Sequence, residues 1–275
     1  MINLQKLYKK PKIFQRLTGL TTDKFQKLLN ELEPLFNAAE LKRKKTTNRQ
    51  RKLGGGRKQS LSLGQTMFML LLYYRTYSNH VFIGMTMGID DSNVCRYFRR
   101  IQPLLAQIFR MPERKITMTE DEILELIVDA TEQDSEKRNG SGYSGKKKRN
   151  TVKTQIVVTP KGKIKSVSKS VVGNMHDKKL YDKTGAYTTI QVKRKGDLGY
   201  VGTSCQTPIK KQKNKPLTDK QKHSNRQFNK SRIIVEHVFA HLKKFNILNH
   251  KFRNSINNYN LIFKNIAGLR NWQLA

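Results

Sequence analysis

The second half of the chain alternates short apolar stretches with helical patterns, and this alternation limits the folds that the chain can adopt. The expected elements, in chain order, are an apolar strand over 123–128 that ends on Asp129, a hairpin over 153–172, a helix beginning near Asp177, a strand over 188–192 and an amphipathic helix over 231–245. Strands and helices in this order pack as a mixed sheet with helices on its faces. We therefore expect an α/β fold here.

The first half of the chain has the residue spacing of helices. Apolar residues recur at helical intervals from Leu17 to Leu35, and Thr22 or Asp23 is the expected cap. A buried helix is expected over 61–77. This part of the chain should form an all-α unit.

A helix-turn-helix is expected inside this unit. The sequence predicts a short helix over 81–87, a tight turn over 88–90 and a further helix that Asp91 or Ser92 caps and that ends near Gln102, just before a proline. Helix, glycine turn and helix is the order of this motif.

The last of these helices has two different faces. The apolar face consists of Val94, Tyr97, Phe98 and Ile101, and the polar face consists of Ser92, Asn93, Arg96, Arg99 and Arg100. Arginine and asparagine suit bidentate contacts with guanine and adenine edges in a major groove. The polar face is therefore a candidate DNA-binding surface, and the alternative is the solvated basic face of an ordinary helical bundle.

The charge of the chain favours a polyanionic partner. The chain carries 55 Lys and Arg against 20 Asp and Glu, a formal net charge of +35. A surface this positive binds nucleic acid strongly even without sequence preference. A ribosomal or otherwise merely basic protein is the alternative explanation.

The length of 275 residues favours two domains. Pro112, followed by Arg114 and Lys115, marks the expected boundary, so we expect a helical domain over 1–115 and an α/β domain over 116–275. The basic, glycine-rich stretch 41–60 reads equally as a minor-groove arm or a solvated linker, and its triple glycine lacks phosphate-loop spacing.

The cysteines and the hydropathy of the chain indicate where in the cell the protein is expected. Cys95 and Cys205 form no CxxC pair and lack the histidine spacing of a zinc site, as expected of reduced cytosolic thiols. Apolar runs such as 67–74 are too short to cross a bilayer, and the start of the chain lacks a signal-peptide core. We expect a soluble intracellular protein.

Three acidic residues stand out against this basic background. Asp129 follows an apolar strand, at the sheet edge where α/β proteins bind ligands. Asp197 lies between glycines that allow a sharp turn, although a plain turn explains it too. Glu236 shares a helix face with Arg232 and Lys243, opposite an apolar face, and a solvated stripe of ion pairs is the alternative.

The residues around these acids resemble the DDE transposases of bacterial insertion sequences, specifically the group called insertion sequence family five. The matching motifs are Val128–Glu132, Tyr143–Lys148, Gly173–Asp177, Gly196–Gly202, Leu217–Thr218 and Arg232–Lys243. The sequence departs from related groups at Asn229, where some have tyrosine, and over 133–142, where the usual proline- and arginine-rich stretch is poorly matched.

The resemblance implies an RNase H-like catalytic domain that a helix-turn-helix domain precedes. It implies that Asp129, Asp197 and Glu236 are the catalytic and metal-binding triad, with two Mg²⁺ or Mn²⁺ ions as cofactors. Hard cations prefer such oxygen ligands, and two ions suit an in-line displacement at phosphorus.

The same resemblance bears on the remaining residues and on the partners. Lys146, Lys147, Lys148, Arg232 and Lys243 would contact phosphates. His176 and Asp177 would support the site, although helix capping by Asp177 is the favoured alternative. The partners would be double-stranded DNA, both terminal inverted repeats and target, and further copies of the chain in a synaptic complex within the bacterial cytoplasm.

Two other functions are also compatible with the sequence. One is a DNA-binding protein of transposase ancestry that no longer cleaves DNA. The other is a nuclease that hydrolyses strands but never joins them.

Overall fold

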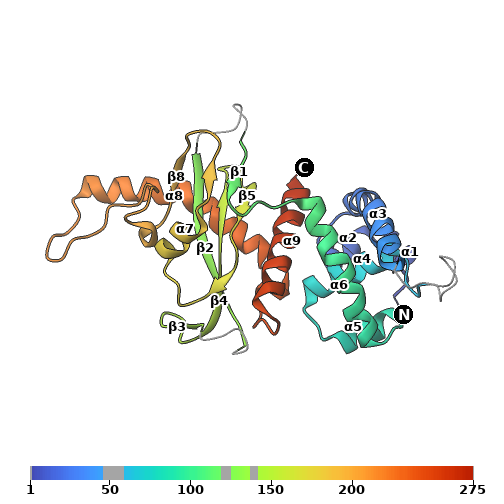
Figure 1. The fold of residues 1–275 in the computed structure, drawn as a ribbon. Helices are drawn as coiled ribbons and strands as arrows, with labels where there is room; N and C mark the ends of the chain where they lie inside the picture. Colours follow the sequence, from blue (N-terminus) through green and yellow to red (C-terminus); the bar gives the residue numbers. More distant parts are fainter. Residues whose placement is uncertain (1, 46–58, 119–124, 137–141, 275) are drawn as a thin grey trace. The chain divides into compact units, whose positions relative to one another are not determined.

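The computed structural model describes residues 2–45, 59–118, 125–136 and 142–274, and the chain divides into two compact units (Figure 1). The first unit comprises Met1–Arg110 with Phe245–Ile247, and the second comprises Met111–Lys244 with Leu248–Ala275. The glycine triplet at 54–56 and the first residues of the expected strand, 123–124, lie outside the described residues. In the described part of the chain, no helix combines the length and hydrophobicity needed to cross a bilayer.

The first unit is helical in its described residues. Its helices are α1 (Leu4–Tyr8), α2 (Pro11–Thr18), α3 (Thr22–Lys44), α4 (Leu63–Thr76), α5 (His80–Met87) and α6 (Asp91–Phe109). Phe14 and Phe25 are fully buried and meet edge to face, with ring centroids 5.0 Å apart, and Phe68 lies 6.0 Å from Phe14. Such aromatic pairs fix how α2, α3 and α4 pack.

α5 and α6 form the expected helix-turn-helix, with two corrections. The turn is as expected, because Gly88 ends α5 in the left-handed conformation that glycine adopts without strain. The cap of α6 is Asp90, whose side chain accepts from the Ser92 N–H at 2.9 Å. The helix also continues through Pro103 instead of ending before it, because burial of Ile101 and Leu105 on either side outweighs the hydrogen bond that proline removes.

In its described residues, the second unit contains a six-stranded mixed sheet. The strands of the unit are β1 (Lys115–Ile116), β2 (Glu125–Asp134), β3 (Tyr143–Ser144), β4 (Arg149–Val158), β5 (Ile164–Val167), β6 (Val171–Val172), β7 (Tyr187–Thr188) and β8 (Lys193–Lys195). Their order is β3-β4-β2-β8, and β5 and β6 also pair with β4. β2 is antiparallel to β4 and parallel to β8, while β1 and β7 form a separate parallel pair.

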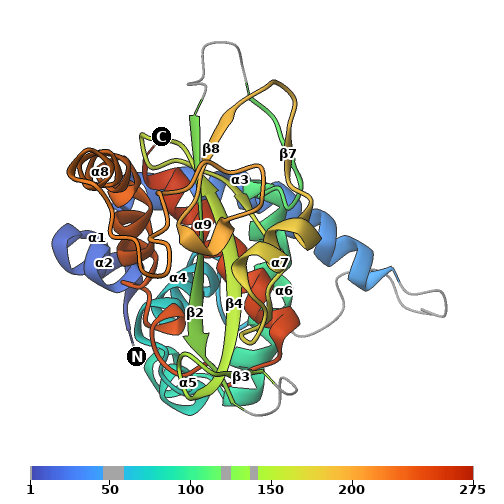
Figure 2. The ribbon, with the colours of Figure 1, turned by 90° about the vertical axis from the view of Figure 1, so that its left-hand side faces the viewer.

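Helices cover both faces of this sheet (Figure 2). They are α7 (Asp177–Thr184), α8 (Asp219–Leu242) and α9 (Ile256–Leu274), with 3₁₀ turns η2 (Leu198–Tyr200) and η3 (Asn246–Leu248). Leu126 and Val128 of β2 pack with Tyr181 of α7, and the alternate residues of the strand face α8. The fold is therefore the expected α/β class, an RNase H-like mixed sheet with flanking helices.

Several predicted boundaries in this unit are wrong. β2 does not end on Asp129 but continues to Asp134, because its polar second half stays paired with β4. The predicted hairpin arm 164–172 is interrupted at Ser168, whose hydroxyl accepts from the Gln155 N–H at 2.9 Å.

The strand before Asp197 and the last amphipathic helix also differ from expectation. The strand is Lys193–Lys195 instead of 188–192, since Ile190 and Val192 pack against the core outside any strand. α8 begins at Asp219, twelve residues before the expected 231, at a capping box between Thr218 and Gln221.

Candidate active site

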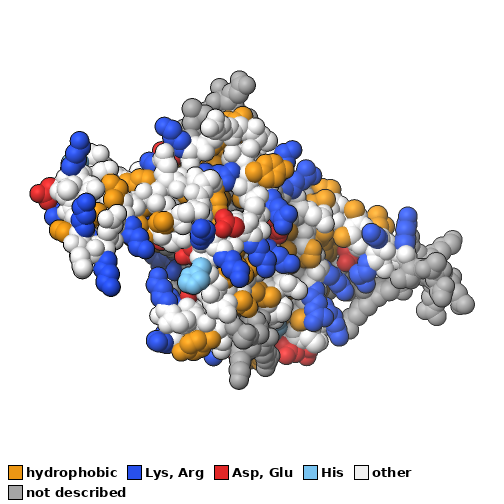
Figure 3. All heavy atoms as spheres, turned by 60° about the vertical axis from the view of Figure 1, so that its left-hand side comes forward, with side chains coloured by type: hydrophobic (Ala, Val, Ile, Leu, Met, Phe, Trp, Pro, Cys, Tyr) orange, Lys and Arg blue, Asp and Glu red, His pale blue; other side chains and the backbone are white. Residues whose placement is uncertain are grey.

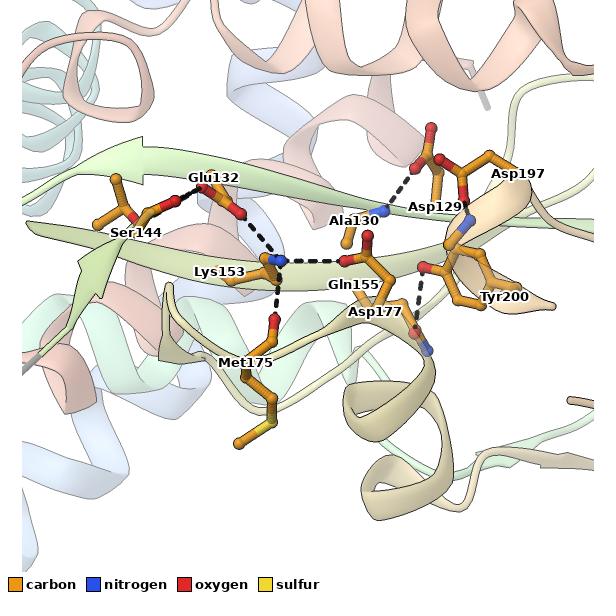
Figure 4. A network of polar contacts seen from close by, with 12 residues as sticks. Asp129, Ala130, Glu132, Ser144, Lys153, Gln155, Met175, Asp177, Asp197 and Tyr200 are labelled. Atoms are coloured by element: carbon orange, nitrogen blue, oxygen red, sulfur yellow. Dashed lines mark hydrogen bonds and ion pairs between the residues drawn. The ribbon is translucent and has the colours of Figure 1, made fainter. Parts of the chain in front are cut away.

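Strand register brings Asp129 and Asp197 to the same level of the sheet. The last backbone pair between β2 and β8 joins Ile127 to Lys195. Asp129 and Asp197 each follow that pair by two residues, and residues two apart on a strand share a face. Their side chains consequently lie side by side where β8 ends (Figure 4).

One cavity joins these two acids to the third. The cavity has a volume of about 480 Å³, and β2, the start of α7, the cap of η2 and α8 all contribute to it. Its lining residues are Asp129, Ala130, Thr131, Glu132, Lys146, Lys147, Lys153, Asp177, Asp197, Glu236, Phe239, Ala240 and Lys243. We call it the acid cavity. The three acids singled out in the sequence therefore meet in one hollow.

Asp129 is held in a largely buried position that opposes its ionisation. Its Oδ1 accepts from the Ala130 N–H at 2.8 Å, and its Oδ2 lies 3.4 Å from Nη2 of Arg232. Burial raises the pKa of Asp129 to about 6, and the charges of Asp197 and Asp177 add to the rise, although the Ala130 hydrogen bond and Arg232 oppose it. A cation in the cavity would stabilise the ionised form.

Asp197 and Asp177 approach each other across a glycine. Asp197 caps η2, where its Oδ1 accepts from the Gly199 N–H at 2.9 Å. A Cβ on Gly199 would lie 2.9 Å from Oδ2 of Asp177 and 3.0 Å from Oδ1 of Asp197. Only a residue without a side chain allows both carboxylates to come this close to the backbone.

A second glycine, Gly196, fits under a buried tyrosine. A Cβ on Gly196 would lie 2.8 Å from the ring of Tyr200, which is fully buried and donates its hydroxyl to Oε1 of Gln155 at 3.3 Å. The two glycines explain the glycine pattern on both sides of Asp197.

A buried lysine links the other acids of the cavity (Figure 4). Nζ of Lys153 on β4 lies 2.8 Å from Oε1 of Glu132 and 3.1 Å from Oδ1 of Asp177, and it donates to the Met175 carbonyl at 2.8 Å. Burial alone would lower the pKa of Lys153, but Glu132 and Asp177 outweigh it and raise the pKa. This ammonium anchors Asp177 at the start of α7.

The favoured capping role of Asp177 is wrong. The cap of α7 is His176, whose side chain makes no capping hydrogen bond, and Asp177 is the first helical residue. Its carboxylate accepts from Lys153 and borders the acid cavity instead. His176 does not line the cavity.

Lys195 holds α8 beside the end of β8 through contacts of its ammonium group. Its Nζ donates to the Ser231 hydroxyl at 3.0 Å, lies 3.0 Å from Oε2 of Glu125 and sits 5.5 Å from the ring centroid of Phe228. The next residue of α8 is Arg232, and Glu236 follows one turn later. The α8 face that carries Arg232 and Glu236 is thereby turned to the acid cavity.

The faces of α8 agree with the amphipathic pattern of the sequence. Val235, Val238 and Leu242 are buried, whereas Glu236 is exposed and makes no hydrogen bond or ion pair with the described residues. Nε of Arg232 is buried and has no hydrogen-bond partner in the described part of the chain.

The predicted phosphate-binding cations divide into two groups. Lys146, Lys147 and Lys243 line the acid cavity, and Arg232 contacts Asp129. Lys148 is not among the lining residues and has a positive φ of 54° at the end of the turn before β4.

The candidate DNA-binding residues of α6 lie in the first unit. Ser92, Arg96 and Arg99 are exposed, and Nη1 of Arg96 donates to Oδ1 of Asn93 at 3.0 Å. Arg100 is partly turned to the protein, because its Nη1 lies 3.9 Å from Oε1 of Glu40. The opposite face, from Val94 to Ile101, is buried as its spacing predicts.

The donor chemistry of the acid cavity fits a hard divalent cation. Its carboxylates supply only oxygen ligands, and burial, with the nearby charges of Asp197 and Asp177, raises the pKa of Asp129, so a cation would stabilise its ionised form. Within the described residues, however, no three side chains of His, Cys, Asp or Glu already stand close enough to hold an ion. The residues of the acid cavity therefore fit a divalent cation, and binding of the cation would draw the carboxylates together.

Sequence reasoning did not single out two residues of the cavity. Glu132 appeared only as the last residue of a matching motif, and Lys153 only as the first residue of the predicted hairpin. Lys153 stands in a predicted strand beside several apolar residues, and such a position can indicate a buried lysine. The sequence alone does not show this, because the partner that would make burial favourable, Glu132, lies on the neighbouring strand.

Comparison with known proteins agrees with this arrangement. Residues 128–271 match the family of DDE superfamily endonucleases, and residues 59–110 match the helix-turn-helix of DDE superfamily endonucleases. A protein named probable transposase for insertion sequence element IS702, from Microchaete diplosiphon, is 33% identical over 274 residues, which cover 95% of this chain and 94% of that protein.

A second relative is more distant. A protein named putative transposase for insertion sequence element IS112, from Streptomyces albus G, is 27% identical over 196 residues, which cover 70% of this chain and 73% of that protein. No solved structure matches the chain significantly. With the family matched over both its catalytic and its helix-turn-helix parts, the chain belongs to the DDE superfamily endonucleases, among the transposases of bacterial insertion sequences.

Proposed function

We propose that this transposase binds the ends of its own element and catalyses two reactions in the acid cavity. The first is hydrolysis of the phosphodiester at the element end, and the second is attack of the freed 3′-hydroxyl on target DNA. The convergence of Asp129, Asp197 and Glu236 on one cavity with a cationic rim is the observation that supports this proposal.

Divalent ions belong to this proposal. Endonucleases of this superfamily generally depend on divalent metals. Asp129, Asp197 and Glu236 would hold two Mg²⁺ or Mn²⁺ ions, and Asp177 borders the same space. Two bound ions would supply activation of the attacking oxygen and stabilisation of the leaving 3′-oxygen.

The side chains of the chain itself have three tasks in this mechanism. Lys146, Lys147 and Lys243 bind phosphate oxygens near the scissile bond and offset developing negative charge. Arg232 keeps Asp129 oriented through its Nη2 and has a further donor, Nε, that no described residue uses. Lys153 holds Asp177 and Glu132 in place through ion pairs.

DNA recognition is assigned to the helical domain, residues 1–115, and catalysis to residues 116–275. Ser92, Asn93, Arg96 and Arg99 of α6 would enter the major groove, with Arg100 at the end of the same face. The protein would act on terminal inverted repeats as a homo-oligomer in the bacterial cytoplasm.

Cleavage of DNA that carries the inverted repeats flanking the gene tests this function. The expected result is nicking at the repeat ends with Mg²⁺ or Mn²⁺ and none with EDTA. Tight binding without nicking under any metal condition would instead identify a DNA-binding protein that has lost catalysis.

A second assay separates a transposase from a hydrolytic nuclease. A repeat end that is already cleaved and carries a free 3′-hydroxyl is incubated with supercoiled target DNA and metal. Covalent joining of the end to the target supports transposition, and hydrolysis without joining contradicts it.

A further inference from the structure

A second hollow runs along α8 and shares the lining residue Glu236 with the acid cavity. Its volume is about 670 Å³. Its lining residues are Leu217, Lys222, Asn225, Arg226, Asn229, Lys230, Arg232, Ile233 and Glu236. We call it the α8 groove. On a helix these positions form one continuous stripe that leads to Glu236.

A loop built against α8 forms part of this region. Oδ1 of Asn225 accepts from the Ile209 N–H at 2.8 Å, and Nδ2 of Asn225 donates to the Ile209 carbonyl at 3.0 Å. The capping box of Thr218 and Gln221 then fixes where the chain enters the helix. The loop and the helix are thus joined by specific polar contacts at two places.

The charge of this segment is strongly one-sided. Residues 206–232 contain nine Lys and Arg and a single acid, Asp219. The cations are Lys210, Lys211, Lys213, Lys215, Lys220, Lys222, Arg226, Lys230 and Arg232. Lys and Arg side chains stand along this part of the surface (Figure 3). The single acid lies 3.0 Å from Nζ of Lys222 in an exposed ion pair, and such a pair is too weak to keep Lys222 from binding a phosphate.

From this geometry we infer that the α8 groove binds the phosphate backbone of the DNA on one side of the scissile bond. The inference rests on the proposed function, because the acid cavity fixes where the scissile phosphate lies. The stretch from Asp219 to Glu236 is about 25 Å long at 1.5 Å per residue, which equals about seven base pairs of duplex.

The groove also explains why α8 starts well before the site. The catalytic face of the helix needs only the turns that carry Arg232, Glu236 and Lys243. The preceding turns, from Asp219 to Lys230, extend the helix and carry mostly polar and basic side chains, none of which is buried. Their cations neutralise phosphates without reading bases, so the groove positions DNA and the sequence is read elsewhere.

The salt dependence of DNA binding tests this inference without cleavage. Binding of a fluorescent duplex of about 30 base pairs is measured by anisotropy in EDTA over a range of salt concentrations. Substitution of Lys222→Gln with Arg226→Gln should reduce the slope of log K against log salt by about 1.8, because each phosphate contact contributes about 0.9. The swap Lys222→Arg with Arg226→Lys keeps both charges and should keep the slope.

A matched control lies on the other side of α8. Lys161 and Lys163 are exposed in the β4–β5 turn, and a Cβ on Gly162 between them would face Ile234 and Val238 of the apolar α8 face. Lys161→Gln with Lys163→Gln removes the same charge and should leave the slope unchanged. An equal loss in both variants, or no loss in the groove variant, overturns the inference.

Shortening the DNA locates the contact. Repeat-end duplexes are trimmed from about ten to about two base pairs beyond the cleavage point, first on one side and then on the other. Trimming one side should weaken binding of the unmodified protein and leave the groove variant unaffected. Equal effects on both proteins would overturn the inference. Because both measurements are made without metal, a failure of cleavage would contradict the proposed function and leave the groove assignment standing.

Discussion

Asp129 and Asp197 lie two residues beyond the same backbone pair, which joins Ile127 of β2 to Lys195 of the parallel neighbour β8. β8 stops at that pair, whereas β2 continues beside β4 to Asp134. Because β8 ends there, no described strand lies beside Asp129 on that side of β2. The carboxylate of Asp197, the cap of η2, occupies this place. A parallel register between two strands of unequal length is therefore sufficient to bring two carboxylates together from distant parts of the chain.

Replacement of Asp129 by asparagine should abolish cleavage, leave DNA binding largely intact and stabilise the metal-free protein. Burial makes the charged carboxylate unfavourable, so its removal should raise the free energy of unfolding by about 1 to 3 kcal/mol at pH 7. Thermal unfolding in EDTA measures this, with exposed Asp182→Asn on α7 as the control. Near-normal nicking by Asp129→Asn would refute the metal assignment.

The pKa of Asp129 also predicts a pH dependence. Arg232, Asp197 and Asp177 face this carboxyl, whose pKa rises from 3.8 to about 6 in the folded protein. Because the folded state holds the proton more tightly, the stabilisation from Asp129 is present below pH 3.8 and is lost as the pH rises through about 6.

Metal binding should follow the opposite course. A proton on Asp129 competes with the cation, so the Mn²⁺ concentration for half-maximal cleavage should rise about tenfold for each pH unit below 6 and level off above it. Titration of Mn²⁺ at several pH values measures this dependence, and DNA binding in EDTA serves as the control. A constant requirement for Mn²⁺ from acidic to neutral pH would contradict the role of Asp129.

Local patterns predicted those parts of the structure that depend on a single element. The buried and exposed faces of α6 and of the end of α8 follow directly from helical spacing, and Gly88 marks the turn before α6. The resemblance to a family, rather than any spacing, suggested that Asp129, Asp197 and Glu236 belong together. Their presence in one cavity is a structural observation, and their catalytic roles remain a prediction.

Long-range pairing explains what the sequence did not show. β8 consists of Lys193–Lys195, a charged triplet with no strand signal, which pairs with Glu125–Ile127 and finds partners for its charges in the fold. Arg194 donates to the Tyr181 hydroxyl and the Ala186 carbonyl, for example. Such partners come from distant segments, so no window of sequence around 193–195 reveals them.

Lys153→Met should destabilise the second unit. The ammonium of Lys153 is almost fully buried between Glu132 and Asp177, and its removal leaves two largely buried acids without their cation. Breaking a buried pair in this way costs about 3 to 5 kcal/mol. Thermal unfolding measures the loss, and exposed Lys161→Met in the β4–β5 turn should show little change. An equal effect of the two substitutions would mean that Lys153 does not anchor these acids.

Gly199→Ala should impair catalysis more than folding. The new Cβ would press between Oδ2 of Asp177 and Oδ1 of Asp197, so the carboxylates must shift, and misplacement of this kind costs about 100-fold in rate. The backbone of Gly199 is not in the left-handed region, so alanine introduces no strain there. Gly145→Ala is the control, because its Cβ would meet nothing within 4 Å. Unchanged cleavage by Gly199→Ala would show that the spacing of these two acids is not critical.

Arg96→Ala tests whether α6 reads bases. Arg96 is exposed, and its hydrogen bond to Asn93 pairs two side chains that suit base edges on the polar face. If Arg96 contacts a base, alanine should weaken binding to the repeat end by about 1 to 3 kcal/mol and leave binding to unrelated duplex nearly unchanged. Competition between the two duplexes in EDTA measures the difference. A uniform loss on both would make Arg96 a phosphate contact, and recognition of the repeat would then depend on other residues of the helix.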